Sequence, residues 1–210
     1  MKLIVLFALV ALSCWSQLLD ERTPDVTTPY APITIHRKFV YALKDSSEAP
    51  SFLFSGISAA FSQQANTHPS FGQGMEGFGH RYGAALLNQA AGNMLTGAVL
   101  PSLLHQDPRY FRRGQGTVVG RALWAATRVV VARSDRHGRW GFNTSEFAGT
   151  AMAVGLSHAY YPDTRTWPTT SQRMLSRIGT DVLSNLVKEF LPDFKRKMAR
   201  RKPGSIAPLP

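Results

Sequence analysis

The clearest pattern of apolar and polar positions lies near the C-terminus, where large apolar residues recur every three to four positions. They are Leu175, Ile178, Val182, Leu183, Leu186, Val187 and Phe190. This spacing predicts an amphipathic helix that buries its apolar stripe and ends near Pro192. The charged residues between them are expected on the opposite face, and they are Arg173, Arg177, Asp181, Lys188 and Glu189.

Three earlier segments combine apolar residues with many glycines and alanines, and each is expected to form a helix. They cover residues 82–104, 118–132 and 147–160. The first is long enough to span a bilayer, but three amide side chains interrupt it and Pro101 bends it. Small side chains let helices approach closely, in a membrane or in a tight bundle. The modest hydropathy favours tight packing, and contact between the first and third segments would explain both runs of small residues.

These segments together predict an all-α fold, a compact bundle of about five or six helices over residues 34–194. Shorter helices are expected over residues 36–44 and 52–61, and the Gly/Ala-rich helices lie at the centre. Asn143 or Thr144 is placed to cap the helix that follows it. The sequence leaves open whether the central helices are embedded in a membrane.

The two ends of the chain differ from this domain. A lysine followed by about ten uncharged apolar residues predicts a signal peptide over residues 1–13, and therefore export to the cell envelope. Cys14 follows directly, in a setting that resembles the lipidated cysteine of a bacterial lipobox, although ordinary cleavage nearby also fits. Three closely spaced prolines predict an extended tether over residues 14–33, and clustered basic residues predict a disordered tail over 195–210.

Composition narrows the classes of partner. The 210 residues include 24 Lys and Arg against 13 Asp and Glu, which gives a net charge of +11. Such a charge is typical of proteins that bind nucleic acid or anionic lipid, and the signal peptide argues against nucleic acid. A single cysteine excludes a disulfide framework and a multi-cysteine metal site. The expected partner is therefore a membrane or an anionic envelope lipid, and a homo-oligomer is left open.

One loop carries residues suited to an anionic head group. Arg109, Tyr110, Arg112 and Arg113 stand close together, and arginine side chains bind phosphate through paired hydrogen bonds. The adjoining aromatic residues suit a membrane interface. The alternative is a structural ion pair from Asp107 to one of the arginines.

The main alternative function is a small envelope hydrolase. His105, Asp107, His158 and Asp163 are its candidate catalytic residues if the fold brings them together. Polar clusters at helix ends are more often structural, so an enzyme is the less favoured interpretation. Residues 72–77 match a dinucleotide-binding glycine pattern, but they lack the preceding strand and the following acid that such a site needs. No cofactor and no metal site are predicted.

Four segments carry a family resemblance: GQGMEGFGHRYGA, LLHQDPRYFRR, SHAYYPD and NLVKEFLPDF. They resemble a group of bacterial envelope proteins without an established activity, and the HQDPRYF and YYPD blocks are the most specific. The resemblance covers residues 37–194. It implies one compact domain and assigns no cofactor or catalytic residue.

The sequence as a whole predicts an exported, membrane-associated envelope protein with a structural or anionic-lipid-interacting role. The substrate or ligand, the oligomeric state and the choice of inner or outer membrane are not set by these patterns.

Overall fold

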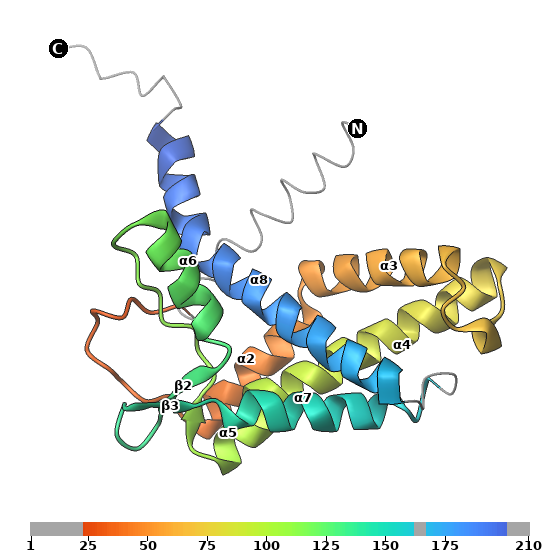
Figure 1. Ribbon diagram of the computed structural model, residues 1–210, viewed down its shortest axis with the longest axis horizontal. Helices are drawn as coiled ribbons and strands as arrows, with labels where there is room; N and C mark the ends of the chain where they lie inside the picture. Colours follow the sequence, from red (N-terminus) through yellow and green to blue (C-terminus); the bar gives the residue numbers. More distant parts are fainter. Residues whose placement is uncertain (1–22, 162–166, 201–210) are drawn as a thin grey trace.

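The computed structural model describes residues 23–161 and 167–200, and the chain is mostly helical there (Figure 1). The helices are α2 (Ile35–Ser47), α3 (Ala49–Gln64), α4 (Gly74–Met94), α5 (Leu100–Leu103), α6 (Val118–Thr127), α7 (Thr144–Ser157) and α8 (Trp167–Arg200). One turn of 3-10 helix, η1 (Pro69–Phe71), precedes α4, and one turn of π-helix, η2 (Leu95–Val99), joins α4 to α5. The helical fold predicted from the sequence is confirmed, but it is not all-α. The signal segment and Cys14 lie outside the described residues.

The fold differs from an all-α bundle because it also contains a small sheet. β1 (Gln106–Asp107), β2 (Val131–Ser134) and β3 (Trp140–Phe142) form an antiparallel sheet in that order, with Asp107 opposite Arg133 and Arg133 opposite Trp140. The buried Lys38 of α2 holds this sheet to the helices. Its ammonium group donates to the carbonyls of Pro101 at 3.0 Å and Gln106 at 2.8 Å, and it pairs with Asp135.

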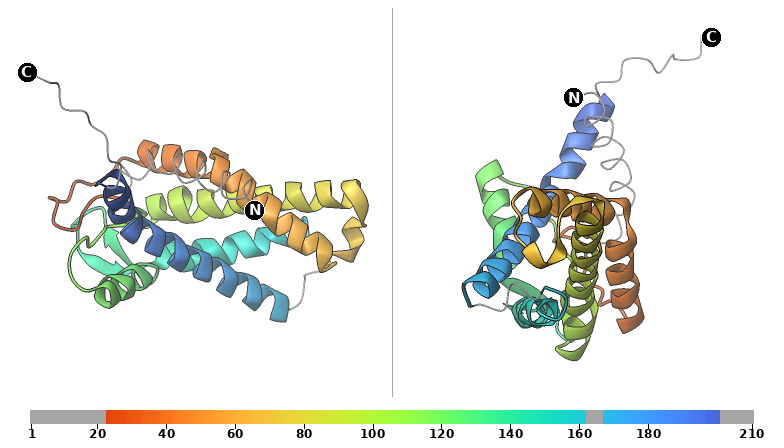
Figure 2. Two further views of the ribbon diagram at one scale, coloured as in Figure 1. Left: turned by 90° about the horizontal axis from the view of Figure 1, so that it is seen from above. Right: turned by 90° about the vertical axis from the view of Figure 1, so that its right-hand side faces the viewer.

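Helices α3 and α4 form an antiparallel arm that extends away from the sheet (Figures 1 and 2). Arg81, which is fully buried, ties the turn of this arm together. Its guanidinium donates to the carbonyls of His68 and Gly72, both at 2.7 Å, and to the side chain of Gln63 at 2.7 Å. Carbonyl groups that the turn leaves without helical partners are thereby satisfied.

The Gly/Ala-rich helices pack against each other as the sequence predicts. α7 lies across the end of α4 and the π turn, and its first turn is capped by Asn143, whose side chain accepts from the amide of Glu146 at 3.2 Å. At Gly149 a Cβ would lie 2.8 Å from Cγ2 of Thr96 and 3.1 Å from the backbone carbon of Leu95, so only glycine allows this approach. Among the described helices, none combines the length and the apolarity needed to cross a membrane.

The predicted domain boundaries are shifted at both ends. Residues 23–33, expected to belong to a tether, lie against the domain: the Val26 amide donates to the Arg112 carbonyl at 2.7 Å, and the Arg112 amide donates to the Pro24 carbonyl at 2.9 Å. Ile33 is buried. At the other end α8 continues to Arg200, so the first residues of the expected tail are helical.

The contact at Gly149 gives a stability test. Gly149→Ala is expected to lower the free energy of unfolding by about 1–2 kcal/mol, because its methyl group would overlap η2. Gly155→Ala in the same helix is the matched control, since a Cβ there has no described atom within 4 Å. That variant should gain about 0.5–1 kcal/mol from helix propensity. Urea unfolding followed by circular dichroism measures both, and equal effects would contradict the packing.

Candidate functional site

The loop predicted to hold an anionic head group instead surrounds a carboxylate of the protein itself. Glu189 of α8 is 0% exposed. Tyr110 Oη and Arg121 Nε donate to its carboxylate, each at 2.7 Å. The backbone amides of Arg113 and Gly114 donate as well, each at 3.0 Å. Burial alone would raise the pKa of Glu189, but these hydrogen bonds outweigh it and hold the pKa below its usual range.

The arginines of this loop differ in their surroundings. Arg112 is buried and donates to Asp193 at 2.6 Å and to the Glu189 carbonyl at 3.0 Å. Arg109 pairs with the buried Asp107 at 2.7 Å, which is the structural alternative that the sequence offered. Arg113 is exposed, with its guanidinium 5.8 Å from the ring of Trp124. Of the four candidate residues, only Arg113 presents its side chain to a ligand from solution.

The candidate hydrolase residues are not brought together. His105 lies beside the start of α7, where the neighbouring Gln106 side chain accepts from the Ser145 amide at 2.8 Å. His158 follows the end of α7, and its Nε2 lies 3.2 Å from the hydroxyl of Thr170. At about 1.5 Å per residue, the 14 residues of α7 separate the two histidines by roughly 20 Å. Asp163 lies outside the described residues.

Helix α8 departs in part from the sequence prediction. Leu175 and Leu183 of the predicted apolar stripe are exposed, at 70% and 63%, whereas the other five stripe residues are half-buried. Two of the charged residues point inward: Arg173 donates to the Ser157 hydroxyl at 3.0 Å, and Glu189 is buried. The prediction that the stripe is buried and the charges are outward is therefore wrong at these four positions.

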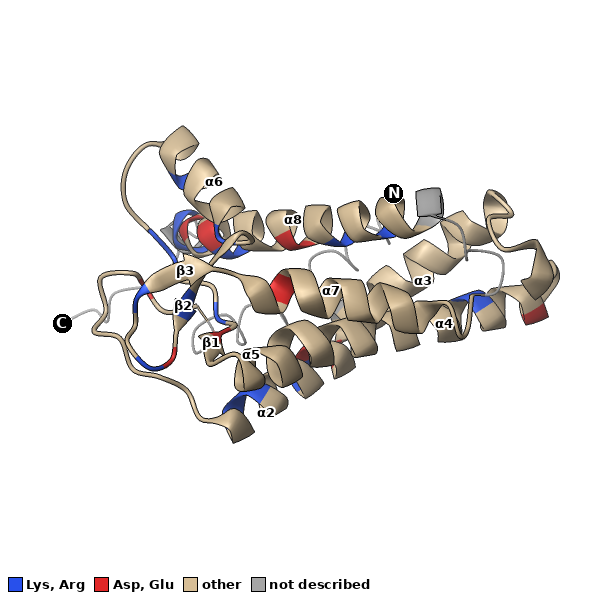
Figure 3. Cartoon of the chain, turned by 60° about the horizontal axis from the view of Figure 1, so that its bottom comes forward, with Lys and Arg blue, Asp and Glu red and all other residues tan. Residues whose placement is uncertain are grey.

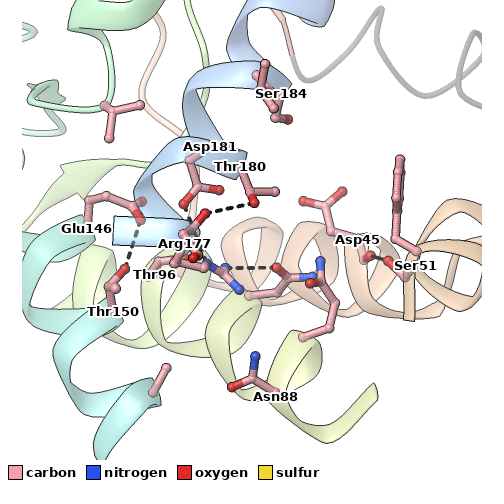
Figure 4. Close-up of a pocket in the computed structure, with 18 of the residues that line it drawn as sticks. Asp45, Ser51, Asn88, Thr96, Glu146, Thr150, Arg177, Thr180, Asp181 and Ser184 are labelled. Carbon is pink, nitrogen blue, oxygen red and sulfur yellow. Dashed lines mark hydrogen bonds and ion pairs between the residues drawn. The ribbon is translucent and has the colours of Figure 1, made fainter. Parts of the chain in front are cut away.

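A central cavity lies between the α3–α4 arm and helices α7 and α8. Its volume is about 1310 Å³. Figure 4 shows Asp45 and Ser51 on one side of it, Asn88 below, and Thr96 beside the α7 and α8 side chains opposite. The inward face of α8 supplies polar residues, while α3 contributes Phe54 and Phe61 together with serines. The cavity therefore has a polar wall on α8 and a mixed wall of serine and phenylalanine on α3.

The polar wall has a charged centre in which α4, α7 and α8 meet. Arg177 Nη2 donates to Asn93 Oδ1 at 3.2 Å, and Arg177 Nε lies 3.5 Å from Asp181 Oδ2. Glu146 of α7 accepts from the Thr150 hydroxyl at 3.2 Å and faces the same group (Figure 4). The guanidinium packs against α4 at Gly92. A Cβ added to Gly92 would lie 2.2 Å from Arg177 Nη1, so this approach requires glycine.

Burial raises the pKa of Glu146 to about 7, the charge of Asp181 adds to the rise, and Arg177 opposes it. The Glu146 carboxyl therefore exchanges its proton near neutral pH, while the guanidinium and amide beside it can donate hydrogen bonds. Such a centre can bind a polar ligand or hold a proton. Among the described residues, no group of histidine, cysteine, aspartate and glutamate is arranged to hold a metal ion.

Comparisons with known proteins found no match among family models, curated proteins or solved structures. The resemblance inferred from the sequence blocks therefore stays a prediction, and the function has to be argued from the geometry.

The residues of the charged centre were visible in the sequence, but in other roles. Glu146 is the only charged residue in an otherwise uncharged helix, and its place in the first turn is typical of an acid that interacts with the helix dipole. Arg177 and Asp181 are spaced four residues apart, as in a solvated ion pair on a helix surface. An isolated charge within an apolar segment is the one signal that points to a buried polar site.

The surroundings of Arg112 and Arg113 predict different effects of substitution on stability. Arg112→Ala should lower the free energy of unfolding by about 2 kcal/mol, because it removes charged hydrogen bonds to Asp193 and to the Glu189 carbonyl from a buried network. Arg113→Ala should change it by no more than about 0.5 kcal/mol, since its side chain is exposed. Urea unfolding distinguishes the two, and a stable Arg112→Ala variant would show that the network is not structural.

Glu146 should make stability depend on pH. Its raised pKa means that the folded state binds the proton more tightly than the unfolded chain does. The contribution of Glu146 to the free energy of unfolding should therefore be largest below a carboxyl group's ordinary pKa of 4.5, fall as the pH rises to about 7, and then level off. The full difference is about 3 kcal/mol.

Glu146→Gln should remove this loss, and Glu76→Gln, at an exposed carboxyl, should retain it. Urea unfolding of the three proteins at pH 5, 6, 7 and 8 makes the comparison. Parallel pH profiles for wild type and Glu146→Gln would show that the carboxyl is not protonated in the fold.

Proposed function

We propose that this is an exported, membrane-associated envelope protein that lies on anionic lipid through the outward apolar face of α8. The observation that carries the proposal is the orientation of that helix, with Arg173 and Glu189 turned inward and Leu175 and Leu183 exposed. Large exposed apolar patches are uncommon on soluble proteins and are typical of membrane or protein contact surfaces.

The outward side of α8 carries large apolar side chains that end in a basic cluster. From Leu175 to Phe194 it extends roughly 30 Å, at about 1.5 Å per residue. Its large exposed side chains are Leu175, Leu183 and Phe194, with Ser176 and Thr180 also exposed, and Lys195, Arg196 and Lys197 follow directly. Helices of this kind lie in the plane of a membrane surface, where basic residues near the end are attracted to anionic lipid.

Helix α6, which packs on α8 through Arg121, adds a second outward apolar face. Val118, Val119 and Leu123 are all exposed there. Beside this face Arg128 lies 4.0 Å from the ring of Trp124 and 4.3 Å from that of Trp140. Tryptophan and arginine are enriched at the membrane–water interface, and the charged residues gather at this end of the molecule (Figure 3).

The hydrolase alternative has no comparable support, because His105 and His158 lie at opposite ends of α7. A lipid anchor at Cys14 is a separate proposal that would strengthen membrane association. The acyl chains and the α8 face are therefore tested independently.

Vesicle flotation tests the α8 face on the full chain carrying Cys14→Ser, so that no acyl chain contributes. The protein should float with vesicles of phosphatidylcholine and phosphatidylglycerol, bind more weakly to phosphatidylcholine alone, and dissociate in high salt. Combining Leu175→Gln, Leu183→Gln and Phe194→Gln should weaken binding at least about tenfold, because the buried apolar area is lost.

The matched control combines Leu103→Gln, Met152→Gln and Leu156→Gln, which are exposed apolar residues on α5 and α7. It should float like the wild type. The proposal fails if both triple variants bind vesicles equally. It also fails if the α8 variant only dissociates a dimer in sedimentation, which would identify a second copy of the chain as the partner.

A further inference from the structure

The central cavity is larger than contact with a membrane surface requires. Pockets for metabolites and drug-sized ligands measure about 300–1,000 Å³, and this one measures about 1310 Å³. Membrane contact through Leu175 and Phe194 does not need the cavity, since neither residue lines it. The cavity therefore calls for an explanation of its own.

The charged centre is matched to a neutral, hydroxyl-rich group better than to an ion. Arg177 already lies between the carboxyl groups of Asp181 and Glu146, so neither a free anion nor a free cation meets an uncompensated charge. Arg177 Nε and Asp181 Oδ2 are buried and lie 3.5 Å apart as an ion pair, and the Asp181 carboxylate also interacts with Glu146. The remaining atoms of these two side chains line the cavity. A ligand hydroxyl group matches such a pair, because it donates to a carboxylate and accepts from a guanidinium.

Other groups extend this pattern along the cavity. Thr180 and Ser184 follow on the inward face of α8, and Asn88 and Gln89 lie on α4 below them. Hydrogen-bond donors and acceptors therefore line more of the cavity than a single hydroxyl group can contact. A ligand with several hydroxyl groups could bind to several of them at once.

The opposite wall suits an apolar part of the same ligand. Phe54 and Phe61 of α3 line the cavity, and both are largely exposed. Aromatic rings pack against the C–H faces of sugars as well as against acyl chains. Leu183, which belongs to the outward face of α8, also lines the cavity, so the cavity reaches the surface proposed to contact lipid.

We propose that the central cavity binds a polyhydroxylated saccharide group, with its hydroxyl groups on the Arg177–Asp181–Glu146 centre and its apolar part against α3. The saccharide can be the head of a glycolipid or a free oligosaccharide, and the chemistry recognised is the same. This site goes beyond the proposed function, which requires only the outward face of α8.

Two variants disturb the centre by different means. Asp181→Asn keeps the shape of the side chain but removes its charge and half of its acceptors. Gly92→Ala places a methyl group where Arg177 lies, since the Cβ would be 2.2 Å from Nη1, and so displaces the guanidinium from α4. The α8 surface variant used here combines only Leu175→Gln and Phe194→Gln and is the control, because neither residue lines the cavity.

Isothermal titration calorimetry on the full chain uses three probes below their micelle concentrations: dodecyl maltoside, dodecylphosphocholine and maltotriose. Wild type should bind dodecyl maltoside saturably at one site, and dodecylphosphocholine at least about tenfold more weakly. Asp181→Asn and Gly92→Ala should each weaken dodecyl maltoside binding about tenfold, as expected for lost hydrogen bonds to charged groups. The α8 surface variant should bind it unchanged.

Each outcome of these titrations supports or overturns the saccharide site. Maltotriose binding as tightly as dodecyl maltoside would support the site and identify a free oligosaccharide as its ligand. Equal binding of the two dodecyl probes, or binding that neither Asp181→Asn nor Gly92→Ala weakens, would overturn the proposal. Loss of vesicle binding with saccharide binding retained would overturn only the membrane function, so the two failures are distinguishable.

Discussion

The burial of the Glu189 carboxylate fixes how α8 is turned about its own axis. A buried charge is tolerated only when hydrogen bonds replace its lost hydration, and the donors here come from α6 and from the loop before it. Any other rotation of α8 would leave this carboxylate buried without partners or would draw it away from Arg121. The same rotation carries Arg177 and Asp181 toward α4 and α7, and Leu175 toward the outside. The cavity centre and the outward apolar face are therefore two consequences of one constraint.

Buried cations use the same principle elsewhere in the molecule. Lys38 and Arg81 are almost fully inaccessible, and each is surrounded mainly by backbone carbonyl groups. They hold the sheet and the tip of the α3–α4 arm where a larger apolar core would otherwise be needed. The most deeply buried apolar residues are correspondingly small, such as Ala98 and Ala125. Many of the large apolar side chains are exposed at the surface instead. This exposure is what the proposed contact with lipid would explain.

Local signals in the sequence were sufficient for much of the fold, and long-range ones were not. Asn143 caps α7 as expected, and Gly149 allows the close contact between helices that the small residues predicted. The strands were missed because they are two to four residues long and are held by partners distant in the chain. The periodicity of α8 predicted a helix correctly but could not show which face is buried, since an apolar stripe is equally compatible with a protein core and a lipid surface. The burial of Glu189 determines which side of α8 faces inward, and its hydrogen-bond partners Arg121 and Tyr110 lie 68 and 79 residues earlier in the chain.

The position of Leu183 connects the two proposals physically. Its side chain is exposed on the face of α8 proposed to lie on lipid, and it also lines the central cavity. If both proposals hold, a lipid head group beside Leu183 lies at the edge of the cavity that Arg177 and Asp181 line. Its hydroxyl groups would exchange the hydration of the membrane surface for the donors and acceptors around Arg177. Because α8 contributes residues to both surfaces, changes that rotate or loosen it, such as loss of the Glu189 network, should impair membrane contact and cavity binding together.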